Sequence, residues 1–166
     1  IVSNDGWLFK HTGDGVCAAF ESPIAAVHAA VEAQRSLGLP VRMGLATGEA
    51  QLRGDDYFGP PLNLAARVMS AGHGGQILLA GVTADLVDGV DLVDLGERRL
   101  KDLSAPQRIV QVAADGLGSE FPPLVTLDEV PGNLPVQVTS FLGRVDDVAA
   151  VTSALRSSRL VTPSGV

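Results

Sequence analysis

The sequence predicts an α+β domain whose mixed, largely antiparallel sheet is covered by helices on one face. Three observations favour this fold class. Short apolar runs suited to strands alternate with segments of helical periodicity, and the turns between them suit hairpins as well as crossovers. The composition is globular, with 46% hydrophobic and 19% charged residues among 166. One sizeable domain and part of another are therefore expected.

The chain begins with a predicted hairpin. Two apolar runs flank Thr12-Gly13-Asp14-Gly15, and Asp-Gly between such runs is a strong hairpin signal. Alternation along the first strand puts Trp7 and Phe9 on one face and Lys10 on the other. In the turn, the glycines leave the carboxylate of Asp14 free to bind a divalent cation. The alternative is that Asp14 only favours the turn conformation and that Lys10 is only a lysine on the solvent-exposed face of an edge strand.

Two helices and further strands follow. Ser22-Pro23 is typical of a helix start, and Gly38 ends that pattern. Pro60-Pro61 starts a second helix that ends near Gly72. Gly54-Asp55-Asp56 is expected to end the strand-like pattern that precedes this second helix. The other predicted elements are strands at 41–47, 76–80, 91–100 and 107–113 and a short helix at 82–87.

The charge and cysteine content exclude several classes of function. A net charge of −7 gives no basic surface for nucleic acid or for an anionic membrane. Cys17 is the single cysteine, so it has no internal disulfide partner. No long apolar span and no leader-like segment occur in the sequence. We therefore expect a cytoplasmic protein without a membrane segment.

Polar residues of the second helix are candidates for binding phosphate groups. Asn63 and Arg67 are four residues apart, so they project from one helix face. A guanidinium fork suits phosphate oxygens, and an amide beside it can donate or accept. The alternative is a solvated helix face. Asp56 precedes this helix, where an acidic residue is also favourable for purely local reasons.

The joint spacing of these residues resembles the class III adenylate/guanylate cyclase catalytic domain. Lys10 and Asp14 match the purine-contacting lysine and the second metal-binding aspartate of that family. Asp56 precedes Asn63 by seven residues and Arg67 by eleven, like the adenine-contacting aspartate and the transition-state asparagine and arginine. The resemblance covers roughly residues 1–113 and implies a ferredoxin-like cyclase fold. Further agreement comes from 43–49, 73–78, 94–97 and 100–103.

The resemblance implies an adenylate cyclase that converts ATP to cyclic AMP and pyrophosphate with two Mg²⁺ or Mn²⁺ ions. It also implies a homodimer, in which Asp14 of one subunit meets the other four residues of its twin. At the base-contacting positions that the resemblance implies, these residue types favour ATP over GTP. Lys10 can donate to adenine N1 and Asp56 can accept from the N6 amino group, whereas guanine presents the reverse pattern.

Two other functions remain open. The module could be a catalytically inactive nucleotide-sensing or dimerisation domain of a regulator, or it could regulate ATP hydrolysis by a C-terminal module. The first strand of the family, with the other metal aspartate, would lie before Ile1. This chain alone is therefore expected to make no cyclic nucleotide.

The C-terminal part resembles the lead-in to a P-loop ATPase module of a signalling regulator. The cyclase domain is expected at 1–114, a Gly- and Pro-rich linker at 115–134, and this truncated module at 135–166. The resemblance rests on Thr139-Ser140-Phe141-Leu142-Gly143-Arg144, on a predicted helix from Val145 to Leu155 and on a strand-like segment at 159–162. The phosphate-binding loop itself is not in the sequence. The alternative is an ordinary linker with a helix. A DNA-binding domain elsewhere in such a regulator is also expected.

Overall fold

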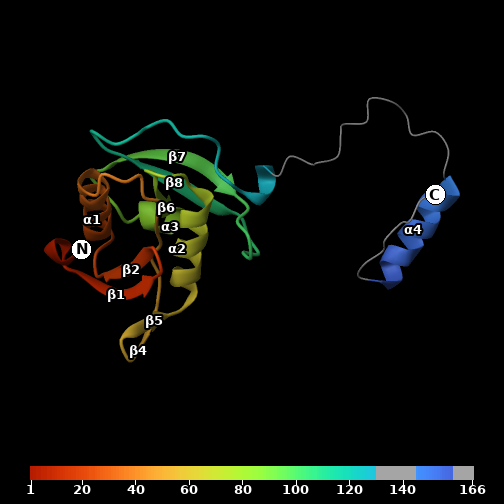
Figure 1. Ribbon diagram of the computed structural model, residues 1–166, viewed down its shortest axis with the longest axis horizontal. Helices are drawn as coiled ribbons and strands as arrows, with labels where there is room; N and C mark the ends of the chain where they lie inside the picture. Colours follow the sequence, from red (N-terminus) through yellow and green to blue (C-terminus); the bar gives the residue numbers. More distant parts are fainter. Residues whose placement is uncertain (130–144, 159–166) are drawn as a thin grey trace. The chain divides into compact units, whose positions relative to one another are not determined.

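The computed structural model of the chain describes residues 1–129 and 145–158. The chain divides into two compact units, Ile1–Val130 and Pro131–Val166. The first unit contains all the strands described and three of the α-helices (Figure 1). None of the helices in these described ranges is long and apolar enough to cross a membrane.

A four-stranded sheet forms the centre of the first unit. Its order is β3-β6-β8-β7, with β3 parallel to β6 and the other neighbours antiparallel. This arrangement confirms the predicted α+β class with a mixed, mostly antiparallel sheet. The bounds are β3 Met43–Leu45, β6 Ile77–Ala80, β7 Asp91–Arg98 and β8 Gln107–Ala113. β3 is thus shorter than the strand expected over 41–47.

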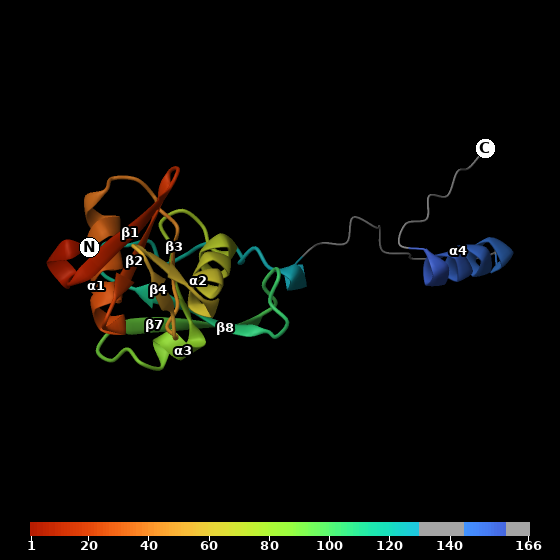
Figure 2. The same cartoon turned by 90° about the horizontal axis from the view of Figure 1, so that it is seen from below.

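Helices cover both faces of this sheet, so the expectation of a single covered face is wrong. Helix α1 is Pro23–Ser36 and helix α2 is Pro60–Ala71. All four residues of β6 are buried, and successive strand residues point to opposite faces. Figures 1 and 2 show α1 and α2 on either side of the unit. The α1 cluster includes Val27, Val31, Ile77 and Leu79, and the α2 cluster includes Val68, Ala71, Leu78 and Ile109.

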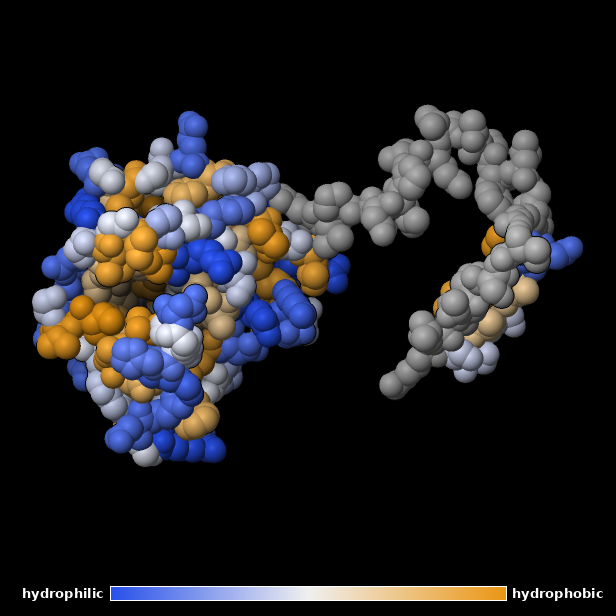
Figure 3. All heavy atoms as spheres, viewed as in Figure 1, coloured by the Kyte–Doolittle hydropathy of each residue, from blue (hydrophilic) through white to orange (hydrophobic). Residues whose placement is uncertain are grey.

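Two antiparallel hairpins complete the first unit. β1 (Gly6–Thr12) and β2 (Gly15–Phe20) confirm the predicted hairpin, and Gly13 in its turn has a φ of 70°. β4 (Gln51–Arg53) and β5 (Asp56–Phe58) form a second hairpin. The interpretation of Asp56 as part of an interruption is therefore wrong, because it begins a strand. Figure 3 shows apolar side chains around a hollow on one face of the unit.

The segment after β8 packs back onto the first unit. Leu124 and Thr126 are buried in it. Between them, the N–H of Val125 donates to the carbonyl of Ala71 at 2.9 Å. The first compact unit consequently includes most of the stretch that the composition assigns to a linker. The remaining short elements are η1 Val2–Asn4, α3 Gly81–Ala84 and η2 Leu127–Glu129.

In the second unit the structure describes helix α4, Val145–Ser157. A helix at this place agrees with the sequence prediction. The motif at 139–144 and the strand-like 159–162 lie outside the described residues, so the resemblance to an ATPase module stays a prediction.

Candidate active site

The structure brings two of the five predicted site residues into contact. The Nζ of Lys10, in β1, donates a hydrogen bond to Oδ2 of Asp56, in β5. The two residues are 46 positions apart in the sequence. The Lys10 side chain is exposed and that of Asp56 is half-buried. The fold therefore places an ammonium donor beside a carboxylate acceptor.

Aromatic packing on the other face of the same strands holds this pair in place. The ring of Tyr57 lies 5.5 Å from that of Trp7 and 5.2 Å from that of Phe9, edge to face in both cases. Because alternate residues of a strand point to opposite faces, Asp56 and Phe58 point away from Tyr57 and toward Lys10. The Lys10 ammonium is 6.0 Å from the centre of the Phe58 ring.

The second oxygen of Asp56 has no partner in the described part of the chain. Oδ1 is buried and accepts no hydrogen bond there. Buried carboxylate oxygens are normally satisfied, so an open acceptor next to a lysine points to a ligand that offers a donor. Lys10 can donate to an acceptor atom of a ligand while Oδ1 of Asp56 accepts from a neighbouring donor atom of the same ligand.

Asn63 and Arg67 lie on α2, one turn apart, as predicted. Asn63 is exposed. The Arg67 side chain is only 32% exposed, and its Nη2 donates to Oδ2 of Asp102 at 2.7 Å. Its Nε is buried without a partner among the described residues. Asp102 lies in one of the family-like stretches of the sequence, but no spacing signal links it to Arg67.

Asp14 stands apart from these groups. It is exposed in the turn between β1 and β2. No hydrogen bond or ion pair in the described ranges joins it, Asn63 or Arg67 to the Lys10 and Asp56 pair. Three or more His, Cys, Asp or Glu side chains do not gather anywhere in these ranges in a way that could hold a metal ion. The described residues therefore do not form a complete Mg²⁺ or Mn²⁺ site, and Asp14 offers a single carboxylate.

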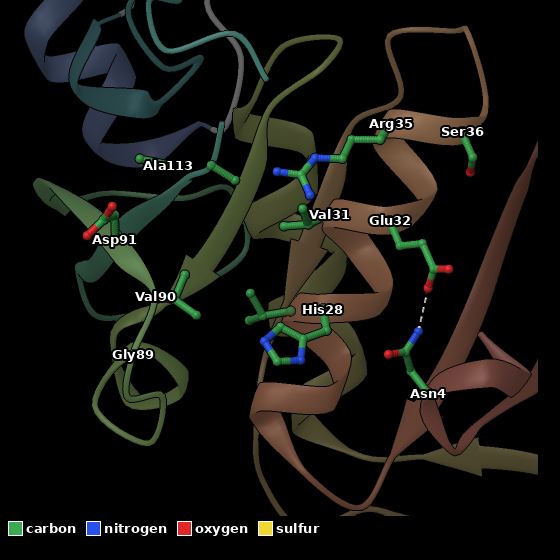
Figure 4. A pocket seen from close by; sticks show the side chains of 12 residues that line it. Asn4, His28, Val31, Glu32, Arg35, Ser36, Gly89, Val90, Asp91 and Ala113 are labelled. Carbon is green, nitrogen blue, oxygen red and sulfur yellow. Dashed lines mark hydrogen bonds between the residues drawn. The ribbon is translucent and has the colours of Figure 1, made fainter. Parts of the chain in front are cut away.

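A pocket of about 670 Å³ lies elsewhere, between α1 and the chain around the start of β7 (Figure 4). Its principal polar groups already have partners. Asn4 Nδ2 donates to Glu32 Oε2 at 2.7 Å, and Arg35 Nη2 donates to the carbonyl of Asp115 at 2.6 Å. None of the five predicted site residues lines this pocket.

Shifted pKa values also occur away from the predicted site. The hydrogen bond from the Arg108 guanidinium, and then one from the Gly96 N–H, lowers the pKa of Asp94. The same contact, with a second one to Asp85, raises the pKa of Arg108. These exposed groups tie β7 and β8 to the end of α3 and serve the fold.

Comparisons with known proteins reveal both uncharacterized relatives and cyclases. No protein-family model matches the chain. An uncharacterized protein of Mycobacterium tuberculosis is 40% identical over 143 residues, which cover 81% of this chain and 50% of that protein. The chain thus spans about half the length of this relative. A Rhizobium meliloti protein named Putative adenylate cyclase 3 is 28% identical over 148 residues, covering 81% of this chain and 25% of that protein.

Solved structures with the same fold are cyclases. An adenylate cyclase of Trypanosoma brucei, described in its monomeric state, superposes with a TM-score of 0.64 at 24% identity, covering 74% of this chain and 76% of that chain. An adenylate/guanylate cyclase/hydrolase of Silicibacter pomeroyi gives a TM-score of 0.57 at 29% identity, covering 69% and 76%. The fold of the first unit is adenylate cyclase-like.

Proposed function

Starting from this adenylate cyclase-like fold, we propose that the chain carries the catalytic domain of an adenylate cyclase that converts ATP to cyclic AMP and pyrophosphate. The contact between Lys10 and Asp56 is the observation that supports it most directly. These residues come from separate hairpins, and packing alone does not require an ion pair beside an open carboxylate oxygen.

The pair suits the edge of adenine. Lys10 offers a donor for N1, and Oδ1 of Asp56 offers an acceptor for the N6 amino group. Guanine carries a donor at N1 and an acceptor at O6. Its N1–H would face the Lys10 ammonium and its O6 would face the Asp56 carboxylate, so neither hydrogen bond could form. In this proposal the two residues select ATP over GTP.

Asn63 and Arg67 act on the triphosphate. In the reaction the ribose 3′-hydroxyl attacks the α-phosphorus: the cyclic ester forms as the bond to pyrophosphate breaks, and the hydroxyl proton passes to water. Negative charge on the phosphate oxygens is stabilised by the Arg67 guanidinium, while Asn63 orients the reacting groups through its amide. Asp14 contributes one carboxylate to a Mg²⁺ or Mn²⁺ site whose other ligands lie outside the described residues of one chain.

We also propose that the active unit is a homodimer within a signalling or transcriptional regulator. Within one chain, no hydrogen bond or ion pair of the described residues joins the Lys10 and Asp56 pair, the two α2 residues and Asp14 to one another. A twofold dimer can bring such separate groups together, because each subunit supplies what the other lacks. Exposed apolar side chains near the β4–β5 hairpin, Leu52 and Phe58, are available for such an interface.

The test measures cyclic nucleotide formation by the full-length protein with ATP or GTP in the presence of Mn²⁺ or Mg²⁺. Asp56→Asn replaces the charged acceptor by a neutral amide, which binds adenine N6 more weakly and can donate to guanine O6. The preference for ATP should therefore fall by roughly 10- to 100-fold. Asp88→Asn, at an exposed aspartate distant in sequence from the site, is the matched control and should retain the preference. ATP binding without any product would instead support an inactive nucleotide-sensing module.

A further inference from the structure

We propose that Asp102 is a positioning residue for Arg67. This inference rests on the function proposed above and adds a residue that acts through the arginine rather than on ATP. The carboxylate lies in the loop between β7 and β8, 35 residues from Arg67 in the sequence, and accepts the hydrogen bond from Nη2 at 2.7 Å.

Arg67 depends on this contact for its orientation. A free arginine side chain has many rotamers, and its guanidinium can point in many directions. Within the described residues, Asp102 provides the one hydrogen bond that its side chain makes, and Nε is buried without any. The bond at Nη2 restricts the directions in which the guanidinium can point and leaves both N–H groups of Nη1 for phosphate oxygens.

The backbone of Asp102 supports a role for its side chain. Its φ is 61°, in the left-handed region that glycine occupies without strain. Ten described residues have a positive φ, and eight of them are glycines. Glycine would therefore suit the loop better than aspartate on conformational grounds alone. Aspartate is one of the few other residue types that adopt this conformation, and at position 102 its carboxylate also bonds Arg67.

The loop itself is fixed in place relative to α2. Leu100, two residues before Asp102, is fully buried in the core on the α2 side of the sheet. The segment after β8 joins both elements, because Val125 N–H donates to the carbonyl of Ala71 and Leu127 N–H to that of Arg99, each at 2.9 Å. The last residue of α2 and the first residue of the loop are thus bonded to the same segment.

This arrangement predicts an effect on catalysis with little effect on folding. Both side chains are partly exposed, and ion pairs of this kind contribute little to stability. A misoriented guanidinium would still be present near the triphosphate, but it would stabilise the transition state less. Loss of Asp102 should lower kcat and leave the KM for ATP nearly unchanged.

The experiment uses the full-length protein and measures kcat, KM and the melting temperature for wild type, Asp102→Ala, Asp102→Gly, Arg67→Ala and the double variant Arg67→Ala with Asp102→Ala. We expect kcat to fall about 10-fold in Asp102→Ala, with KM within about 2-fold. Asp102→Gly should melt at a higher temperature yet lose kcat in the same way. Asp85→Ala breaks another exposed ion pair of 2.7 Å, with Arg108, and is the matched control.

The double variant separates positioning from an independent role. If Asp102 acts through Arg67, its loss in the Arg67→Ala background should cause no further fall in kcat. The positioning role would be overturned by an unchanged or raised kcat in Asp102→Ala and Asp102→Gly, or by an additive loss in the double variant. If the wild-type protein is active in the same assay, the proposed function still stands. A wild-type protein that makes no cyclic AMP would overturn both.

Discussion

At the scale of single residues, the Lys10 and Asp56 pair depends on the aromatic rings behind it. Tyr57 contacts the rings of Trp7 and Phe9 and so holds β5 against β1. Tyr57→Ala should lower the free energy of unfolding by roughly 2 kcal/mol and weaken ATP binding, because the two strands lose their common packing. Urea denaturation and nucleotide titration measure the two effects. Tyr57→Phe keeps the ring and should behave like wild type.

A second residue-scale prediction concerns pH. The ordinary pKa of an aspartate is 3.8, and the contacts with Arg108 and Gly96 lower that of Asp94. A lowered folded-state pKa stabilises the fold above the ordinary value, and this contribution disappears as the pH falls through the lowered pKa. Asp94→Asn should therefore cost more stability near neutral pH than at about pH 2, which lies below the ordinary pKa. Urea unfolding at both pH values tests it, and an equal loss at both would contradict the assignment.

At the scale of elements, α2 can pack close to β3 because Gly44, in β3, has no side chain. A Cβ at this position would lie 2.5 Å from the carbonyl oxygen of Ala65 and from the backbone N of Met69. Gly44→Ala should therefore push α2 outward, destabilise the protein by roughly 1–3 kcal/mol and reduce activity, since Asn63 and Arg67 move with the helix. Thermal unfolding together with a cyclase assay measures both. Gly89→Ala measures strain without crowding, because φ is 74° there and a Cβ meets nothing within 4 Å, whereas Gly44 has no positive φ and its substitution reports crowding.

The strands and helices with strong signals were predictable from the sequence. The hairpin around Asp14, the Pro23 helix start and the Pro60 helix start all lie where their chemistry indicates, although the hairpin turns at Gly13-Asp14 and Gly15 already belongs to β2. The β4–β5 hairpin was missed because its strands have three residues each, too few for alternation to be recognised. The second covered face was missed although Ile77-Leu78-Leu79-Ala80 is a continuous apolar run, which is typical of a strand buried on both sides.

The candidate site was predictable in part. The residue types and spacing singled out Lys10 and Asp56, and the structure brings them into contact. The contact between Arg67 and Asp102 was not predictable, because it depends on how the β7–β8 loop lies against α2. A left-handed aspartate in a loop leaves no periodic signal in the sequence.

At the scale of the whole molecule, the segment after β8 links the first unit to the rest of the chain. Leu124 is buried against the α2 side of the core, next to the backbone bonds at Ala71 and Arg99. Leu124→Ala should lower the free energy of unfolding by about 2–3 kcal/mol and loosen the β7–β8 loop. Hydrogen exchange at the amides of 125 and 127 should then become faster than in wild type. The exposed Val125→Ala is the control and should leave exchange nearly unchanged.

The central claim is an ATP-cyclising site shared between two copies of the chain, and complementation tests it most directly. Full-length Asp14→Ala and Arg67→Ala variants are each assayed for cyclic AMP, and are then co-expressed and assayed together. In a twofold dimer with two equivalent sites, half of the mixed population carries one intact site of its two, so about a quarter of wild-type activity should return. A mixture as inactive as either variant alone, beside an active wild type, would contradict the claim.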